Sequence, residues 1–85
     1  MKLELYYYPS CPFCRIVIEV IHQLELKVDY KNIHEDFSNM EKLKKDTGRT
    51  TVPCLYIDNN PMFESYDIME WLKTNKDKLE KVYGS

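Results

Sequence analysis

The beginning of the chain joins a strand pattern to a helix pattern with almost nothing between them. Leu3, Leu5 and Tyr7 recur at every second position, which predicts a strand that ends at Pro9. From Pro12 to about Leu24 the apolar residues recur at helical spacing, which predicts an amphipathic helix. The chain therefore opens as a strand followed directly by a helix.

A second strand and a second helix are predicted from the next segment. Val28, Tyr30 and Ile33 indicate the strand, so the first helix crosses over between two strands that should be parallel. The segment "SNME", residues 38–41, has the form of a capping box that opens the second helix. Gly48 is well placed to end that helix.

The last third of the chain predicts a hairpin and a final helix. "TVPCLYI", residues 51–57, is a mostly apolar strand, residues 58–61 form a turn, and "MFE", residues 62–64, is a short returning strand. A helix then begins near Ser65 and runs on through Leu79 and Val82, with Ile68, Trp71 and Leu72 buried. The order predicts a four-stranded mixed sheet with about three helices, which is a thioredoxin-like α/β architecture.

Size and charge narrow the possible partners. The chain has 85 residues, no obvious flexible linker and 44% hydrophobic residues, so we expect residues 1–85 to form a single globular domain. A formal net charge of −2 provides no basic surplus, so neither nucleic acid nor a membrane surface is expected as a partner. The N-terminal segment does not resemble a secretory leader, so we expect a cytoplasmic protein.

The segment "CPFC" carries the chemistry. Pro12 suits the first turn of a helix, and this makes Cys11 the residue just before the helix. Unpaired N–H groups and the helix dipole favour a thiolate there, and thiol pKa values in such settings fall to about 3.5 to 7.5 from about 8.5. We expect Cys11 to be the nucleophile, with Cys14, one turn inside the helix, resolving a mixed disulfide by attacking Cys11.

Other roles for the cysteines remain open from the residues alone. "CPFC" is also compatible with an inert buried pair or with half of a zinc site. The chain has no second C-x-x-C, and Cys54, His22 and His34 are scattered singly, so we predict no metal site. Burial in a strand is the favoured interpretation of Cys54, and a regulatory thiol is the alternative.

Four features in order carry a resemblance to a known family. With the first strand, "CPFC", "TVP" and "ESYDI", the chain resembles the glutaredoxins, and among them those that are similar to the N-terminal domain of glutathione S-transferases. The resemblance extends from about residue 3 to residue 73. It implies the thioredoxin-like (glutaredoxin) fold and glutathione as a co-substrate, with no tightly bound cofactor.

The resemblance also implies a set of glutathione contacts. A cis bond between Val52 and Pro53 would leave the backbone of Val52 free to pair with the cysteinyl part of glutathione. Ser65 would bind the γ-glutamyl carboxylate and Glu64 would lie near the amino group; from the residues alone, Ser65 is a helix N-cap. The implied glutathione contacts are Tyr8, Pro12, Phe13, Arg49, Thr51, Val52, Pro53, Glu64 and Ser65.

The chain departs from the family pattern at three places. Phe13 stands where many dithiol glutaredoxins have tyrosine, and little consequence is expected. Tyr8 replaces a lysine that often binds the glycine carboxylate of glutathione, which leaves Arg49 as a candidate substitute. The pair of glycines common before the γ-glutamyl site is absent, with Met62 and Phe63 nearby instead, and this departure favours the transferase-like branch.

The resemblance implies a monomeric dithiol glutaredoxin that reduces glutathione mixed disulfides and protein disulfides. One alternative is a thioredoxin-like protein disulfide reductase that does not use glutathione. Another is a binding module for glutathione or for an iron-sulfur cluster at Cys11, although Pro12 argues against the cluster. Glutathione transferase activity is expected less, because the chain ends near the point where transferases add a helical domain.

Overall fold

The computed structural model describes residues 1–83, and its elements follow the predicted order. The first strand and helix are β1 (Leu3–Tyr7) and α1 (Pro12–Gln23). After them come β2 (Asp29–Asn32), α2 (Phe37–Thr47), β3 (Cys54–Ile57), β4 (Asn60–Met62) and α3 (Ser65–Asn75), with a short 3₁₀ helix (Lys76–Lys78) at the end. The predicted four-stranded sheet with three α-helices is confirmed for these residues.

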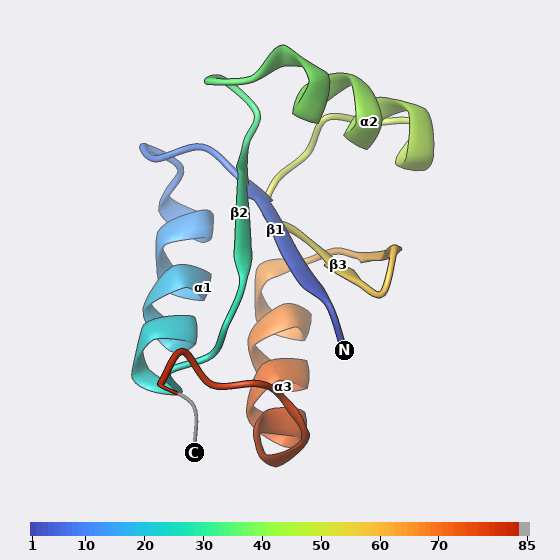
Figure 1. Cartoon of the computed structure of the whole chain (residues 1–85). Helices are drawn as coiled ribbons and strands as arrows, with labels where there is room; N and C mark the ends of the chain where they lie inside the picture. The colour runs from blue at the N-terminus through green and yellow to red at the C-terminus, as the bar shows by residue number, and fades with distance from the viewer. Residues whose placement is uncertain (84–85) are drawn as a thin grey trace.

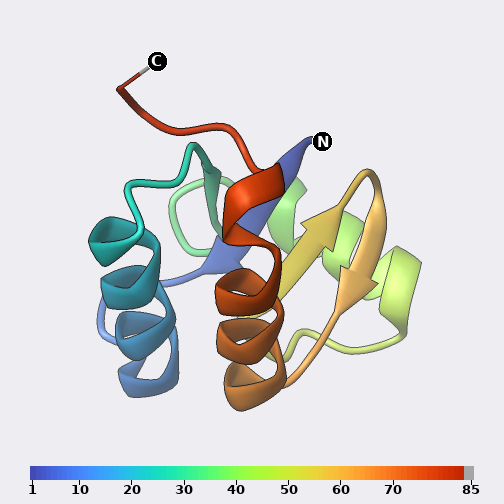
Figure 2. The same cartoon turned by 90° about the horizontal axis from the view of Figure 1, so that it is seen from below.

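The sheet has the strand order β2-β1-β3-β4. Strand β1 is parallel to β2 and antiparallel to β3, and β3 is antiparallel to β4. Helices α1 and α3 lie side by side on one face of the sheet, and α2 covers the other (Figures 1 and 2). The central strands are therefore covered on both faces.

The side chains of β1 alternate between two hydrophobic clusters. Leu3 and Leu5 belong to the larger cluster, which also contains the buried residues of α1 and α3. Tyr6 points to the other face and joins the smaller cluster with Leu43 of α2 and Tyr56 of β3. The alternation of apolar residues in the sequence predicted that Leu3 and Leu5 share one face of the strand. It did not predict that Tyr6, on the opposite face, is also buried.

The hairpin between β3 and β4 is tighter than predicted. Asp58 and Asn59 have positive φ angles of 47° and 71°, and Ile57 pairs with Asn60 across the turn. Two adjacent residues with positive φ are typical of a type I′ turn, and short polar side chains such as these tolerate that conformation. Strand β4 consequently begins at Asn60, so the prediction of a returning strand at residues 62–64 is wrong by two positions.

Helix α2 begins earlier than the predicted capping box. Asp36 is the N-cap, and its carboxylate accepts hydrogen bonds from the backbone N–H of Ser38 at 3.0 Å and from the Ser38 hydroxyl at 2.7 Å. An ionised carboxylate accepts hydrogen bonds more strongly than a hydroxyl, so Asp36 takes the capping position. Gly48 ends the helix as predicted, with φ of 79°.

The predicted continuation of the last helix through Leu79 and Val82 is wrong, because α3 ends at Asn75. Leu79 has extended backbone angles and is buried in the larger cluster. The chain then pairs with the segment after α1, and the N–H of Val82 donates to the carbonyl of Glu25 at 2.7 Å. No helix within residues 1–83 combines the length and apolar character needed to cross a membrane.

We predict that Gly48→Ala lowers the free energy of unfolding by about 1 kcal/mol, because a side chain at positive φ is disfavoured there. A Cβ at this position would meet no atom within 4 Å, so the cost comes from the backbone alone. Urea denaturation followed by circular dichroism measures the change. Gly48→Asn is the matched control, and its free energy of unfolding should fall by less, because asparagine tolerates this conformation. Equal decreases for the two variants would contradict the explanation.

Candidate active site

Cys11 occupies the N-cap of α1. Its backbone has φ of −75° and ψ of 116°, and its carbonyl accepts the first helical hydrogen bond, from the N–H of Arg15 at 3.0 Å. The sulfur accepts a hydrogen bond from the N–H of Cys14 at 3.3 Å. A thiol group thus occupies the place of a capping serine or aspartate side chain, where N–H groups and the helix dipole favour negative charge.

The two sulfurs of "CPFC" differ in their surroundings. Cys14 is completely buried, and burial, followed by a hydrogen bond with Cys11, raises the pKa of the Cys14 thiol to about 12. Cys11 is 4% exposed, so the residue predicted to be the nucleophile is also largely covered by the protein. The loop before α1 is tied to the helix start, where the Cys11 N–H donates to the Tyr8 carbonyl at 3.1 Å.

Cys54 lies in β3 and is completely buried in the smaller cluster. Burial is the main cause that raises the pKa of its thiol to about 12. The positive charge of Arg49 acts in the opposite direction, but its effect is smaller. A buried, protonated thiol is a poor nucleophile, so these surroundings fit the structural interpretation of Cys54.

A pocket of about 300 Å³ brings together many of the residues singled out from the sequence. This volume lies at the lower end of the range typical of small-molecule sites. The residues predicted from the sequence that line it are Phe13, Thr51, Val52, Pro53, Glu64 and Ser65. Segments from both sides of the β3–β4 hairpin and from the start of α1 therefore meet here.

Phe63 and Tyr66 also line this pocket, and they were not predicted as site residues. Phe63 is half-buried and packs against the smaller cluster, whereas Tyr66 is 71% exposed. A sequence signal existed for each. Phe63 lies near the place where the glycine pair of the family is absent, and Tyr66 directly follows the serine predicted to bind the ligand.

Val52 presents an unpaired stretch of backbone at the pocket. The Val52–Pro53 bond is cis, as the resemblance implied. Within residues 1–83, neither the N–H nor the carbonyl of Val52 forms a backbone hydrogen bond. An extended peptide could therefore pair with Val52 as an added strand pairs with the edge of a sheet.

The start of α3 differs from the prediction that Ser65 is its N-cap. Glu64 is the N-cap and makes no side-chain capping hydrogen bond, while Ser65 is the first residue of the helix and is buried. The Ser65 side chain thus faces inward at the pocket rather than capping the helix. The acidic Asp67 lies in the first helical turn, where it complements the helix dipole.

Three predicted contacts lie outside the lining of this pocket. The ring of Tyr8 stacks on His34, with ring centroids 4.5 Å apart. The guanidinium carbon of Arg49 lies 4.0 Å from the centroid of the Phe63 ring, so Arg49 adjoins the pocket through one of its walls. Pro12 lies at the end of a different pocket, along α1.

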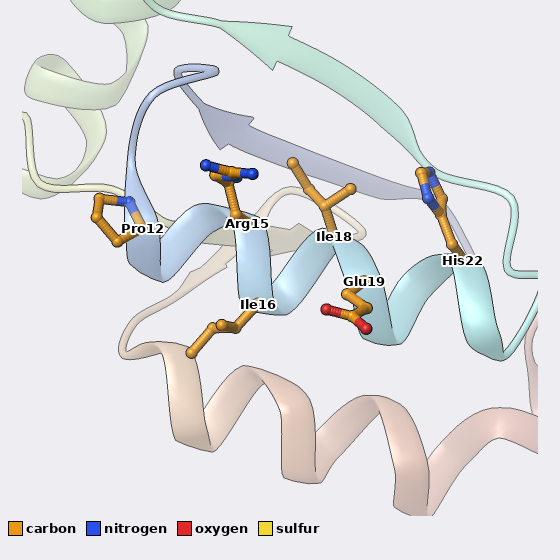
Figure 3. Close-up of a pocket in the computed structure, with 6 residues that line it drawn as sticks. All are labelled: Pro12, Arg15, Ile16, Ile18, Glu19 and His22. Atoms are coloured by element: carbon orange, nitrogen blue, oxygen red, sulfur yellow. The ribbon is translucent and has the colours of Figure 1, made fainter.

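The pocket along α1 has a volume of about 520 Å³ and lies on the outer surface of that helix. Figure 3 shows Arg15, Ile18 and His22 on one side of the helix and Ile16 directed towards α3. No cysteine lines either this pocket or the smaller one, and a residue close to Cys11 in sequence lines each of them, Pro12 here and Phe13 there. In the part of the chain that the structure describes, no three His, Cys, Asp or Glu side chains gather closely enough to hold a metal ion.

Comparison with protein families identifies the class of this domain. Residues 5–80 match the family described as the N-terminal domain of glutathione S-transferase, and the chain belongs to this family. The resemblance stated from "CPFC", "TVP" and "ESYDI" is confirmed at this level. A search of curated proteins finds no match.

Three solved structures illustrate the similarity. A glutathione transferase homolog from Drosophila mojavensis with bound glutathione is 28% identical, with a TM-score of 0.77 over 91% of this chain and 36% of that one. The thioredoxin-like protein BC3987 is 25% identical, with a TM-score of 0.74 over 86% of this chain and 97% of that one. Glutaredoxin from Brucella melitensis is 16% identical, with a TM-score of 0.67 over 92% of this chain and 86% of that one, and shares the fold.

The lengths of these relatives differ. This chain spans 36% of the length of the transferases that it matches. It spans nearly the whole of the thioredoxin-like protein. The shared part is therefore the thioredoxin-like domain that contains Cys11 and the adjoining pocket.

We predict that iodoacetamide labels the native protein at Cys11 alone at about pH 7.5, because Cys14 and Cys54 are fully buried, protonated thiols. Mass spectrometry of the intact protein should find one added group, and peptide mapping should place it at Cys11. All three cysteines should react in denaturant. Labelling of Cys54 at the rate of Cys11 in the native state would contradict the assignment.

We further predict that stability falls in alkali, in part through Cys54. Because the pKa of its thiol is higher in the folded state, the unfolded state loses this proton first, and the stabilisation is lost as pH rises from about 9 towards about 12. Urea denaturation at about pH 8 and about pH 10.5 measures how far the free energy of unfolding falls between these pH values. The fall should be smaller for Cys54→Ala than for the native protein, by on the order of 1 kcal/mol. Burial also raises the pKa values of Tyr6, Tyr56 and Cys14, but these residues are present in both proteins, so the difference between the two losses reports mainly on Cys54. Equal losses would contradict the prediction.

Proposed function

We propose that this protein is a glutathione-dependent thiol-disulfide oxidoreductase, a dithiol glutaredoxin that reduces glutathione mixed disulfides and protein disulfides. The observation that carries the proposal is the position of Cys11. Its sulfur lies at the start of α1 and accepts the N–H of Cys14, and Phe13 of the same helical turn lines a partly buried pocket that has an unpaired peptide edge at Val52. The combination of a thiol and a peptide edge fits a cysteine-containing peptide better than it fits a metal ion.

The proposed reaction begins when the Cys11 thiolate attacks the glutathione sulfur of a mixed disulfide. A bond forms between Cys11 and glutathione, the original disulfide bond breaks, and the substrate leaves as a thiolate that takes a proton from water. A second glutathione thiolate then attacks the bound glutathione sulfur, which releases oxidised glutathione and the Cys11 thiolate. In each turnover one glutathione thiol is oxidised and the substrate sulfur is reduced to a thiol, while the glutathione of the mixed disulfide becomes the other half of oxidised glutathione, so the electrons balance.

Cys14 provides an alternative second step. After losing its proton to solvent, its sulfur attacks Cys11, forms the Cys11–Cys14 disulfide and releases reduced glutathione. Burial and the raised pKa of Cys14 make this step slow at neutral pH, which keeps Cys11 available to external glutathione. The same pair would serve the reduction of a protein disulfide, which needs both thiols.

Two observations support glutathione as the co-substrate. The chain belongs to the N-terminal domain family of glutathione S-transferases, and a 28% identical homolog carries bound glutathione. We assign the cysteinyl backbone of glutathione to Val52 and its γ-glutamyl end to Glu64 and Ser65, which lie in the same pocket. Phe13 and Thr51 line the same pocket, and Pro12 directly follows Cys11 in the chain.

A thioredoxin-like reductase that does not use glutathione is the second candidate. It is favoured by the match to a thioredoxin-like protein of nearly the same length. The two candidates differ in the electron donor and in the need for Cys14. Parallel assays with glutathione plus glutathione reductase, and with thioredoxin plus thioredoxin reductase, distinguish them.

We predict that Cys11→Ser abolishes glutathione-dependent reduction of a glutathionylated peptide, because the attacking sulfur is absent. Cys14→Ser should retain part of this activity but lose the reduction of a protein disulfide. Both rates are measured through NADPH consumption by glutathione reductase. The control is Cys54→Ser, which should retain both activities.

Full activity of Cys11→Ser would overturn the mechanism. Loss of peptide reduction in Cys14→Ser, together with activity only in the thioredoxin assay, would favour the second candidate. Conjugation of 1-chloro-2,4-dinitrobenzene to glutathione, without disulfide reduction, would indicate a transferase instead. Each result therefore selects one of the chemistries that the family fold accommodates.

A further inference from the structure

Phe63 and Arg49 form a contact that links the proposed glutathione pocket to a positive charge outside it. The guanidinium carbon of Arg49 lies 4.0 Å from the centroid of the Phe63 ring, within the distance of a cation–π interaction. Phe63 also lines the pocket, whereas Arg49 does not. The Phe63 ring therefore contacts the Arg49 guanidinium and also forms part of the pocket wall.

Both members of this pair are fixed by the surrounding structure. Phe63 is half-buried and packs against the smaller hydrophobic cluster, which restricts the position of its ring. The backbone of Arg49 follows the left-handed Gly48, and the single proton of the Thr47 hydroxyl has two acceptors in reach, the Leu43 carbonyl at 2.7 Å and the Arg49 carbonyl at 2.9 Å. The same hydroxyl accepts the N–H of Arg49 at 3.3 Å. Arg49 is thus held at its backbone by the end of α2 and at its side chain by Phe63.

The charges of neighbouring groups leave Arg49 available to an anion. In residues 1–83, the ion pairs involve other cations, and no carboxylate lies within 4.0 Å of the Arg49 guanidinium. Stacking satisfies one face of the planar group and leaves the N–H donors at its edge free for a carboxylate. An exposed arginine without such a ring would lose rotamer entropy on binding an anion.

We propose that Phe63 is a positioning residue that holds Arg49 for the glycine carboxylate of glutathione. This inference rests on the proposed function and extends it to a residue that does not itself contact the charge of the ligand. It also accounts for the chain's departures from the family pattern. Tyr8 provides no cation where the resemblance implies a lysine, and Arg49, held by the Phe63 ring, would supply the missing charge.

Binding of S-methylglutathione tests the proposal without any disulfide chemistry. Isothermal titration should find that Phe63→Leu weakens binding about three- to tenfold, because the stacking that orders Arg49 is lost. Phe63→Tyr keeps the ring and should bind as the native protein does. Met62→Leu, a change at the adjacent half-buried residue, is the matched control for packing and should also leave binding unchanged.

A double-mutant cycle separates positioning from the direct effect of Phe63 as a pocket wall. In the Arg49→Met background, Phe63→Leu should weaken binding less than twofold, since no charge remains to be positioned. The ethyl ester of the glycine carboxylate should bind to native protein and to Phe63→Leu with similar affinities. In the peptide assay, Phe63→Leu should raise the KM for glutathione by a similar factor and leave kcat unchanged.

Additive effects of the two substitutions, or an equal effect of Phe63→Leu on the ester, would overturn the proposal and leave the oxidoreductase function intact. The same holds if Phe63→Tyr weakens binding as much as Phe63→Leu. Failure of the native protein to bind S-methylglutathione would overturn the glutathione-dependent function together with this inference. The NMR resonance of the Arg49 Nε–H group checks the free protein, because its ring-current shift should be retained in Phe63→Tyr and disappear in Phe63→Leu.

Discussion

Burial of β1 on both faces is the constraint on which the rest of the structure depends. Leu3 and Leu5 anchor the helices α1 and α3, while Tyr6 on the opposite face packs with Tyr56 and the α2 side of the protein. Pairing with β2 and β3 fixes the position of this strand within the sheet. Because α1 must pack against the strand it follows, the short connection brings Cys11 to the helix start.

The features predicted correctly from the sequence were those set by local periodicity or by a residue with one strong preference. The alternation of apolar residues predicted β1, their helical spacing predicted α1, and Gly48 predicted the end of α2. The errors arose where two local solutions compete: Asp36 caps α2 ahead of Ser38, and Glu64 takes the N-cap of α3 ahead of Ser65. Tertiary packing decided the remainder, since burial of Leu79 ended α3 and the folded protein largely covers Cys11.

The candidate site shows a similar division. The order of "CPFC", "TVP" and "ESYDI" was sufficient to predict that Phe13, Val52 and Ser65 lie together, because a family pattern records their spatial proximity. The same pattern is silent on Phe63 and on the stacking of Tyr8 with His34, since these contacts belong to this particular chain. Their positions in the fold distinguish the three cysteines, since Cys11 caps α1, Cys14 lies within its first turn and Cys54 begins β3.

The pairing of the chain's last described residues with the segment after α1 affects how the protein can be joined to others. This pairing holds Val82 near Glu25, at the C-terminal end of α1, whereas Cys11 lies at the N-terminal end of the same helix. Met1 also lies towards the end of the molecule that is remote from Cys11 (Figure 1). A fluorescent protein, an affinity tag or a surface linker attached at either end would thus extend away from the reactive sulfur and leave its approach open.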